Sequence, residues 1–183
     1  MTDVVGLVLA AGAGERFGGP KSLARTADGD PWVARAVHLL LGGGCDAVVV
    51  VLGAGSEEAS GLIPEQASVV IADRWRTGMG ASLSAGIGGL PEADAALITL
   101  VDLPGMPVAV VERVLQVGTG RDVLARASYD GRPGHPVLLG RDHWAAFRDS
   151  LRGDAGGRIY LEEHDVTHVE CGDLFSGTDV DRR

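Results

Sequence analysis

The sequence is poor in cysteine, in positive charge and in long apolar runs. Its two cysteines, Cys45 and Cys171, argue against a disulfide-stabilised secreted protein and suit a reducing compartment. The 16 lysines and arginines are outnumbered by 25 acidic residues, and the net charge of −9, without a basic stripe, argues against nucleic acid as a partner. No apolar run reaches the roughly 18 residues of a membrane span, and the start lacks a signal peptide. We therefore expect a cytoplasmic protein that binds neither nucleic acid nor a membrane.

The sequence also lacks repeats, linkers and low-complexity segments. Hydrophobic residues make up 45% of the chain and charged residues 22%, a balance that argues against disorder. A length of 183 residues favours one domain over residues 1–183. Glycine, by contrast, is abundant: 28 scattered glycines indicate many tight turns or close approaches of the backbone to a ligand.

Short apolar segments typical of buried parallel strands alternate with helical segments. The expected strands are 4–10, 47–52, 68–72, 95–101, 123–127, 136–139 and 167–170. The expected helices are 31–41, a short one after residue 55, 79–88, 107–117, 143–151 and 156–164, with Asp30 capping the first of them. This alternation predicts an α/β fold: a single Rossmann-like three-layer domain with a mostly parallel sheet.

A glycine-rich loop follows the first expected strand, where residues 9–21 read LAAGAGERFGGPK. Its glycines allow consecutive amides to form a concave phosphate site, while Arg16 supplies a fork of donors and Lys21 a point charge. The dinucleotide fingerprint is incomplete, because Phe17 replaces its third glycine and Gly53 stands where an acid is expected. A P-loop is also unsupported, since Pro20 separates Lys21 from the preceding glycine. Taken alone, the glycine pair of this loop is equally consistent with an ordinary surface turn in which Arg16 and Lys21 form surface ion pairs.

Asp102 follows the fourth expected strand, so it should emerge at the same sheet edge as this loop. Magnesium favours one or two carboxylates together with substrate phosphates, and Asp102 suits that role. The alternative reading makes Asp102 a cap for the helix expected near Pro107. Asp154 is most simply a helix cap, and a contact with the acceptor substrate is its less favoured reading. Trp75 and Trp144 could stack on a ligand ring, but packing is the favoured reading for both.

The motif Leu-Ala-Ala-Gly-x-Gly-x-Arg-Phe-Gly, followed by a lysine, resembles the signature of the MobA/MocA-like nucleotidyltransferases, and in particular the molybdenum cofactor cytidylyltransferases. The resemblance extends along most of the chain, through the segments GMGASL, DLP, GHP, GDAG and DVD at residues 78–83, 102–104, 134–136, 153–156 and 179–181. It implies a Rossmann-like domain that binds a nucleoside triphosphate and Mg²⁺.

The resemblance also implies roles for individual residues. Arg16, Lys21 and Asp102 would be catalytic, Asp102 would bind magnesium with Asp181 or, less favoured, Asp179, and His135 would face the acceptor. The implied nucleotide-binding residues are Leu9, Ala10, Ala11, Gly12, Gly14, Arg16, Lys21, Gly80 and Ser82. A metal ligand so near the end of the chain is prone to fraying, and a histidine satisfied by backbone hydrogen bonds is the other reading of His135.

The expected reaction is transfer of CMP from CTP to a phosphorylated acceptor such as molybdopterin, with release of pyrophosphate. Ala11 favours CTP over GTP by the same resemblance, and a molybdoenzyme or its maturation chaperone is the expected protein partner. Two alternatives stay open. One is an NAD(P)H-dependent oxidoreductase, because some relatives with the GRPGHP segment of residues 131–136 are labelled nicotine blue oxidoreductase. The other is a nucleotide binder without turnover.

Overall fold

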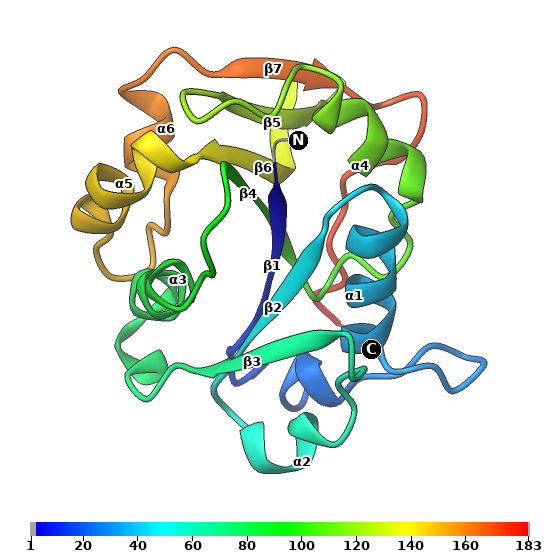
Figure 1. Cartoon of the computed structure of the whole chain (residues 1–183). Helices are drawn as coiled ribbons and strands as arrows, with labels where there is room; N and C mark the ends of the chain where they lie inside the picture. Colours follow the sequence, from blue (N-terminus) through cyan, green and yellow to red (C-terminus); the bar gives the residue numbers. More distant parts are fainter. Residues whose placement is uncertain (1–2, 183) are drawn as a thin grey trace.

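A computed structural model describes residues 3–182, which form one seven-stranded sheet in the order β3-β2-β1-β4-β6-β5-β7 (Figure 1). The strands are β1 (Val4–Ala10), β2 (Ala47–Leu52), β3 (Ala67–Ile71), β4 (Ala95–Leu100), β5 (Leu124–Tyr129), β6 (Arg132–Gly140) and β7 (Thr167–Glu170). β6 runs antiparallel to β4 and β5, whereas the other pairings are parallel. The predicted α/β fold with a mostly parallel sheet is confirmed.

Helices cover both faces of the sheet and give the three layers (Figure 1). On one face lie α1 (Trp32–Gly42) and α4 (Val108–Leu115); on the other lie α3 (Met79–Gly88), α5 (Trp144–Ser150) and α6 (Arg158–Glu162). The short helices are α2 (Ser56–Ser60), η1 (Lys21–Leu23), η2 (Trp75–Thr77) and η3 (Arg141–His143). Among the described helices, none has the length and apolar character needed to cross a membrane.

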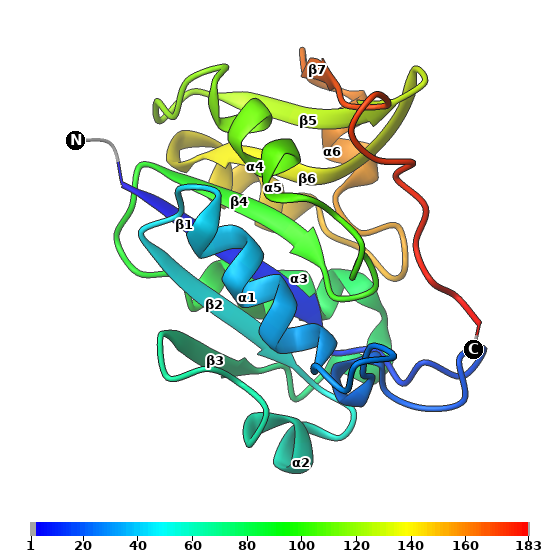
Figure 2. The ribbon, with the colours of Figure 1, turned by 90° about the vertical axis from the view of Figure 1, so that its right-hand side faces the viewer.

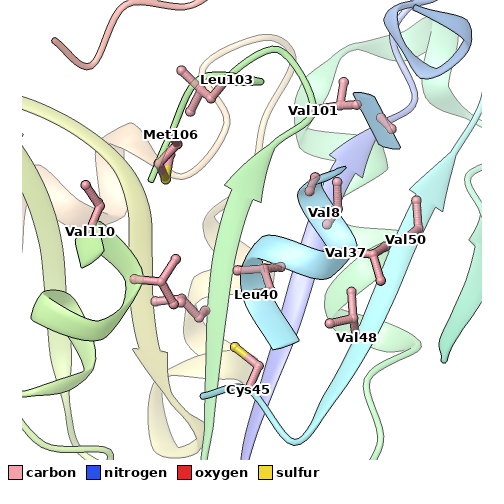
Figure 3. Close-up of a cluster of buried hydrophobic side chains, with 14 of the residues drawn as sticks. Val8, Val37, Leu40, Cys45, Val48, Val50, Val101, Leu103, Met106 and Val110 are labelled. Atoms are coloured by element: carbon pink, nitrogen blue, oxygen red, sulfur yellow. The ribbon is translucent and has the colours of Figure 1, made fainter. Parts of the chain in front are cut away.

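The core lies between the sheet and these helices, because the central strands are apolar on both faces. Val37 and Leu40 of α1 pack over Val8 of β1 and Val48 and Val50 of β2 (Figure 3). All five side chains are at most 1% exposed, so each contributes about 1.5–3 kcal/mol by burial. This rigid centre positions the strand ends from which the loops emerge.

Residues after β1 and β4 reach the same edge of the sheet, since Leu9 lies opposite Leu100 in the parallel register. The amide of Val101 donates to the carbonyl of Leu9 at 3.1 Å and extends this pairing by one residue. The glycine-rich loop and Asp102 therefore start from neighbouring positions, as the sequence predicts.

The first helix differs from its prediction at the N-terminus. The N-cap residue is Pro31, and the Asp30 side chain makes no capping hydrogen bond. Its carboxylate lies 3.7 Å from Arg35 instead, while its amide donates to Thr26 Oγ1 in a tight turn. The prediction that Asp30 caps this helix is therefore wrong.

Candidate active site

The glycine-rich loop folds around the carbonyl of Gly14. This oxygen accepts the amides of Phe17 and Gly18 at 2.9 Å and that of Gly19 at 3.1 Å. Gly14 has φ 62°, and an added Cβ would lie 1.9 Å from the carbonyl oxygen of Gly19. Only glycine fits this position, since a side chain would meet both an unfavourable φ and the backbone.

The loop forms one wall of a cavity of about 700 Å³ beyond the carboxyl ends of β1 and β4. The predicted residues that line it are Leu9, Ala10, Ala11, Gly12, Gly14, Arg16, Lys21, Ser82, Asp102 and Asp181. An added Cβ at Gly12 would meet no protein atom within 4 Å, so this glycine borders open space. The structure thus brings most of the residues implied by the resemblance into one cavity.

Three carboxylates meet at this cavity. Oxygen atoms of Asp102, Asp179 and Asp181 lie within 4.8 Å of one another. Asp102 Oδ1 is buried and has no hydrogen-bond partner among the described residues. A hard cation such as Mg²⁺ fits this set, because it prefers carboxylate oxygens and would satisfy the buried one.

Lys21 bridges two of these carboxylates. Its Nζ lies 2.8 Å from Asp102 Oδ2 and 2.9 Å from Asp181 Oδ1, and its side chain is 14% exposed. Burial alone would lower the pKa of Lys21, but hydrogen bonds to Asp102 and Asp181 and their charges raise it above the ordinary value. The same bond to Lys21 lowers the pKa of Asp181. Both shifts favour the charged forms of Lys21 and Asp181.

Arg16 extends this network toward solvent. Its Nη1 lies 3.0 Å from Asp181 Oδ2, and its side chain is 75% exposed. Such an exposed pair contributes little to stability, so Arg16 can exchange its carboxylate for a ligand phosphate at small cost.

The C-terminal segment lies against this site, and Asp181 pairs there with Lys21 and Arg16. The amide of Val180 donates to the carbonyl of Asp102 at 2.9 Å. In Figure 2 the red segment descends from β7 to the blue loop that follows β1. Further back, the Phe175 ring packs edge-on against Tyr129, with centroids 5.8 Å apart. These contacts bring Asp179 and Asp181 to the end of β4 although they are distant in sequence.

The N-terminus of α3 forms another part of the wall, through Gly78, Met79 and Ser82. Gly80 lies elsewhere: it is buried, its amide donates to the carbonyl of Gly153 at 2.8 Å, and it does not line the cavity. Asp154 Oδ1 accepts the amide of Met79 at 3.3 Å. The prediction that Asp154 caps the helix after it in sequence is wrong, because α6 has Gly157 at its N-cap and Asp154 instead accepts an amide at the N-terminus of α3.

Trp75 lines this cavity, where the sequence favoured packing over stacking on a ligand ring. An added Cβ at Gly53 would lie 2.6 Å from the carbonyl oxygen of Ala11 and 2.7 Å from Trp75. The end of β2 therefore has no room for the acid that a dinucleotide site uses there. The Arg76 guanidinium lies 4.4 Å from the Trp75 ring centroid and adds a further cation to this wall.

His135 lies outside this cavity and lines a second one, of about 660 Å³. The two cavities adjoin, because Leu9 and Met79 line both. Burial first, and then the charge of Arg126, lowers the pKa of His135 to about 4, so the ring is neutral at pH 7. Its carbonyl accepts the Tyr129 hydroxyl at 2.6 Å.

Comparison with known proteins agrees with this geometry. Residues 6–169 match the family model of the MobA-like NTP transferase domain. The chain belongs to the MobA-like NTP transferase family. The family is one of nucleotidyltransferases.

Individual MobA-like relatives carry different names. The chain is 35% identical to a nicotine blue oxidoreductase from Paenarthrobacter nicotinovorans, over 97% of this chain and 92% of that protein. It is similar to the structure of Rv0371c from Mycobacterium tuberculosis H37Rv, with 25% identity, a TM-score of 0.82 and coverage of 99% and 94% of the two chains. Rv0371c has also been solved as a complex with manganese. A nucleotidyl transferase from Methanothermobacter shares the fold, at 23% identity, a TM-score of 0.80 and coverage of 98% and 92%.

Proposed function

We propose that this MobA-like protein transfers CMP from CTP to a phosphorylated acceptor such as molybdopterin and releases pyrophosphate. The observation that carries the proposal is the meeting of the loop at residues 11–21 with the three carboxylates at one cavity. A glycine-rich loop with two cations suits a triphosphate, and clustered carboxylates suit its divalent ion. The manganese complex of Rv0371c supports a divalent ion in a protein of this fold.

In the proposed reaction, an anionic phosphate oxygen of the acceptor forms a bond to the α-phosphorus of CTP. The bond between that phosphorus and the oxygen bridging to the β-phosphate breaks, and pyrophosphate leaves with the electron pair. No proton has to be removed, because the attacking oxygen already carries negative charge. The protein therefore contributes orientation and charge neutralisation and needs no general base.

The place of each residue in the cavity indicates its part in the proposed reaction. Asp102, with Asp181 or Asp179, would hold Mg²⁺, which supplies positive charge to the phosphates when bound. Lys21 contacts Asp102 and Asp181, Arg16 contacts Asp181, and both cations line the cavity in which the triphosphate would bind. Ala11, which supports the choice of CTP by resemblance, is 4% exposed in the cavity wall.

We also propose that the protein acts in the cytoplasm. A molybdoenzyme, or the chaperone that matures one, would receive the product. Both remain predictions from the sequence.

A second candidate is an NAD(P)H-dependent oxidoreductase, because the relative from Paenarthrobacter nicotinovorans bears that kind of name and aligns with 97% of this chain. The crowding at Gly53 speaks against it, since a dinucleotide site places a ribose-binding acid at the end of β2. The carboxylate cluster would also have no evident use in hydride transfer.

Thermal shift with CTP, GTP, ATP, NADH and NADPH, each with and without Mg²⁺, separates the two candidates. A ligand at a hundred times its Kd stabilises the fold by about 2.7 kcal/mol, which is a measurable shift. We expect Mg²⁺-dependent stabilisation by CTP, its loss in Asp102→Asn and its retention in Glu15→Gln. Glu15 is a matched control, because it lines the same cavity outside the carboxylate cluster. Stabilisation by NADH or NADPH alone, indifferent to Asp102, would contradict the transferase.

A further inference from the structure

Arg126 is a partly buried cation that the proposed chemistry does not use. It lies on β5 and lines the second cavity, next to His135. Its Nε is buried without a hydrogen-bond partner, and Nη2 donates to the carbonyl of Gly134 at 3.3 Å. Over residues 3–182 it forms no ion pair with a carboxylate. A guanidinium withdrawn from water without an anion is costly.

No carboxylate of residues 3–182 forms an ion pair with Arg126, although Glu162 lines the same cavity. Burial lowers its pKa, and only the charge of Glu162 acts in the other direction. Glu162 itself lies 3.8 Å from Arg158, and His135 is neutral at pH 7. The positive charge of Arg126 is thus available to a ligand.

The rest of the cavity wall is largely apolar. Its buried apolar side chains are Leu9, Leu83, Ile98, Val137, Phe147 and Leu161. A volume of about 660 Å³ suits a ligand of several rings. Polar and charged groups at the wall include Asp165, His164 and His168, and His164 Nδ1 is already bonded to the carbonyl of Tyr160 at 2.7 Å.

We propose that the second cavity binds an organic acceptor with an apolar body, and that Arg126 selects it by pairing with an anionic group such as a carboxylate or phosphate. This inference rests on the proposed transferase function, because only a transferase has an acceptor. Because Arg126 lines only the second cavity, the group that it binds is distinct from the CTP phosphates. Leu9 and Met79 line both cavities, so the second cavity lies beside the proposed nucleotide site.

The test uses two fluorescent probes of nearly the same shape: anilinonaphthalene sulfonate, which is anionic, and phenylnaphthylamine, which lacks the sulfonate. We expect Arg126→Met to weaken binding of the sulfonate about tenfold to a hundredfold and to leave the neutral probe unchanged, because a hydrogen-bonded charge is lost. Arg158→Met is the matched control. It removes an exposed cation of the same wall and should change either affinity by less than about twofold. Val166→Trp, which narrows the cavity, should weaken both probes.

Equal affinity of the sulfonate for Arg126→Met and wild type, or an equal loss of both probes, would overturn the inference. So would an Arg158→Met loss as large as that of Arg126→Met, because binding would then follow surface charge. Thermal shift of each variant with CTP and Mg²⁺ keeps the two proposals apart, since Arg126 does not line the nucleotide cavity. Failure of wild type to bind CTP would contradict the transferase function. An unaltered affinity of Arg126→Met for the sulfonate would contradict only the role of Arg126.

Discussion

Lys21 and Arg126 are partly buried cations of adjoining cavities, and their charges are balanced in different ways. Lys21 lies between two carboxylates at 2.8 and 2.9 Å, whereas Arg126 has one weak bond to a carbonyl at 3.3 Å. A paired cation stabilises the free protein and gives way only when a metal or phosphate replaces its partners. An unpaired cation destabilises the free protein and gains when an anion arrives. In the first cavity a ligand would therefore replace existing partners of the cation, whereas in the second cavity an anion would pair with a cation that has none.

The largest expected effect concerns the carboxylate side of this comparison. Asp102→Asn should reduce pyrophosphate release from CTP, with molybdopterin as acceptor, by about 10²–10³-fold, because charge neutralisation of the phosphates fails. Glu15→Gln, in the same cavity, should retain the wild-type rate within a few-fold. A similar rate loss in both variants would mean that general cavity charge, and not the cluster, supports the reaction.

The two glycines of the loop provide a second contrast. Gly14→Ala should lower the free energy of unfolding by roughly 1–3 kcal/mol, since its Cβ would meet the Gly19 carbonyl at a φ of 62°. Gly12→Ala should leave that free energy within about 0.5 kcal/mol but weaken CTP binding, because its Cβ enters the open cavity. Urea unfolding and CTP titration measure the two properties. A Gly12→Ala protein with lower stability and normal CTP affinity would contradict this assignment.

Removal of Lys21 should lower the free energy of unfolding, whereas removal of Arg126 should leave it unchanged or raise it. Lys21→Met should destabilise the metal-free protein by roughly 1–3 kcal/mol, because Asp102 and Asp181 lose their common partner. Arg126→Met should be neutral or stabilising by up to about 1 kcal/mol, because an unpaired buried charge is replaced by an apolar side chain. Urea unfolding without Mg²⁺ compares the two. Mg²⁺ should restore more stability to Lys21→Met than it adds to wild type, and destabilisation of both variants alike would erase the distinction between the cavities.

Glu170 offers the smallest effect and a third way of balancing a charge, by amides. Its carboxylate accepts the amides of Gly172, Asp130 and Gly131 and the hydroxyl of Ser128, and these bonds lower its pKa to about 2. The unfolded value is about 4.3, so the stabilisation is complete above that pH and is lost as pH falls toward 2. Glu170→Gln should lower Tm at pH 7, with a difference that shrinks between about pH 5 and 2. A difference that is constant with pH would exclude an ionic origin.

The fold and the cavity at the glycine-rich loop were predictable because their signals are local. A fully apolar β1 ending in a glycine cluster, and an acid directly after β4, determine which groups meet once the sheet is parallel. The pairing of Lys21 with Asp102 joins residues 81 apart, and no short-range pattern indicates it. Asp179 and Asp181 reach the site through the Val180 hydrogen bond and the packing of Phe175, which sequence spacing does not reveal.

Arg126 was missed for a different reason. It is the one charge in an otherwise apolar stretch at residues 123–127, which is a local signal that a buried cation needs a partner. That none is present depends on side-chain packing across β5, β6 and α6, which only coordinates show. Gly80 illustrates the reverse: its motif implies the nucleotide, but its position against Gly153 follows from how α3 meets the loop before α6.

We propose that the carboxylate cluster binds a divalent ion together with a nucleotide, and Mn²⁺ electron paramagnetic resonance measures that binding. Free Mn²⁺ is titrated against wild type, Asp102→Asn and Glu15→Gln, with and without CTP. We predict that CTP increases the Mn²⁺ affinity of wild type and Glu15→Gln but not that of Asp102→Asn. Equal Mn²⁺ binding by all three proteins, with no response to CTP, would contradict it.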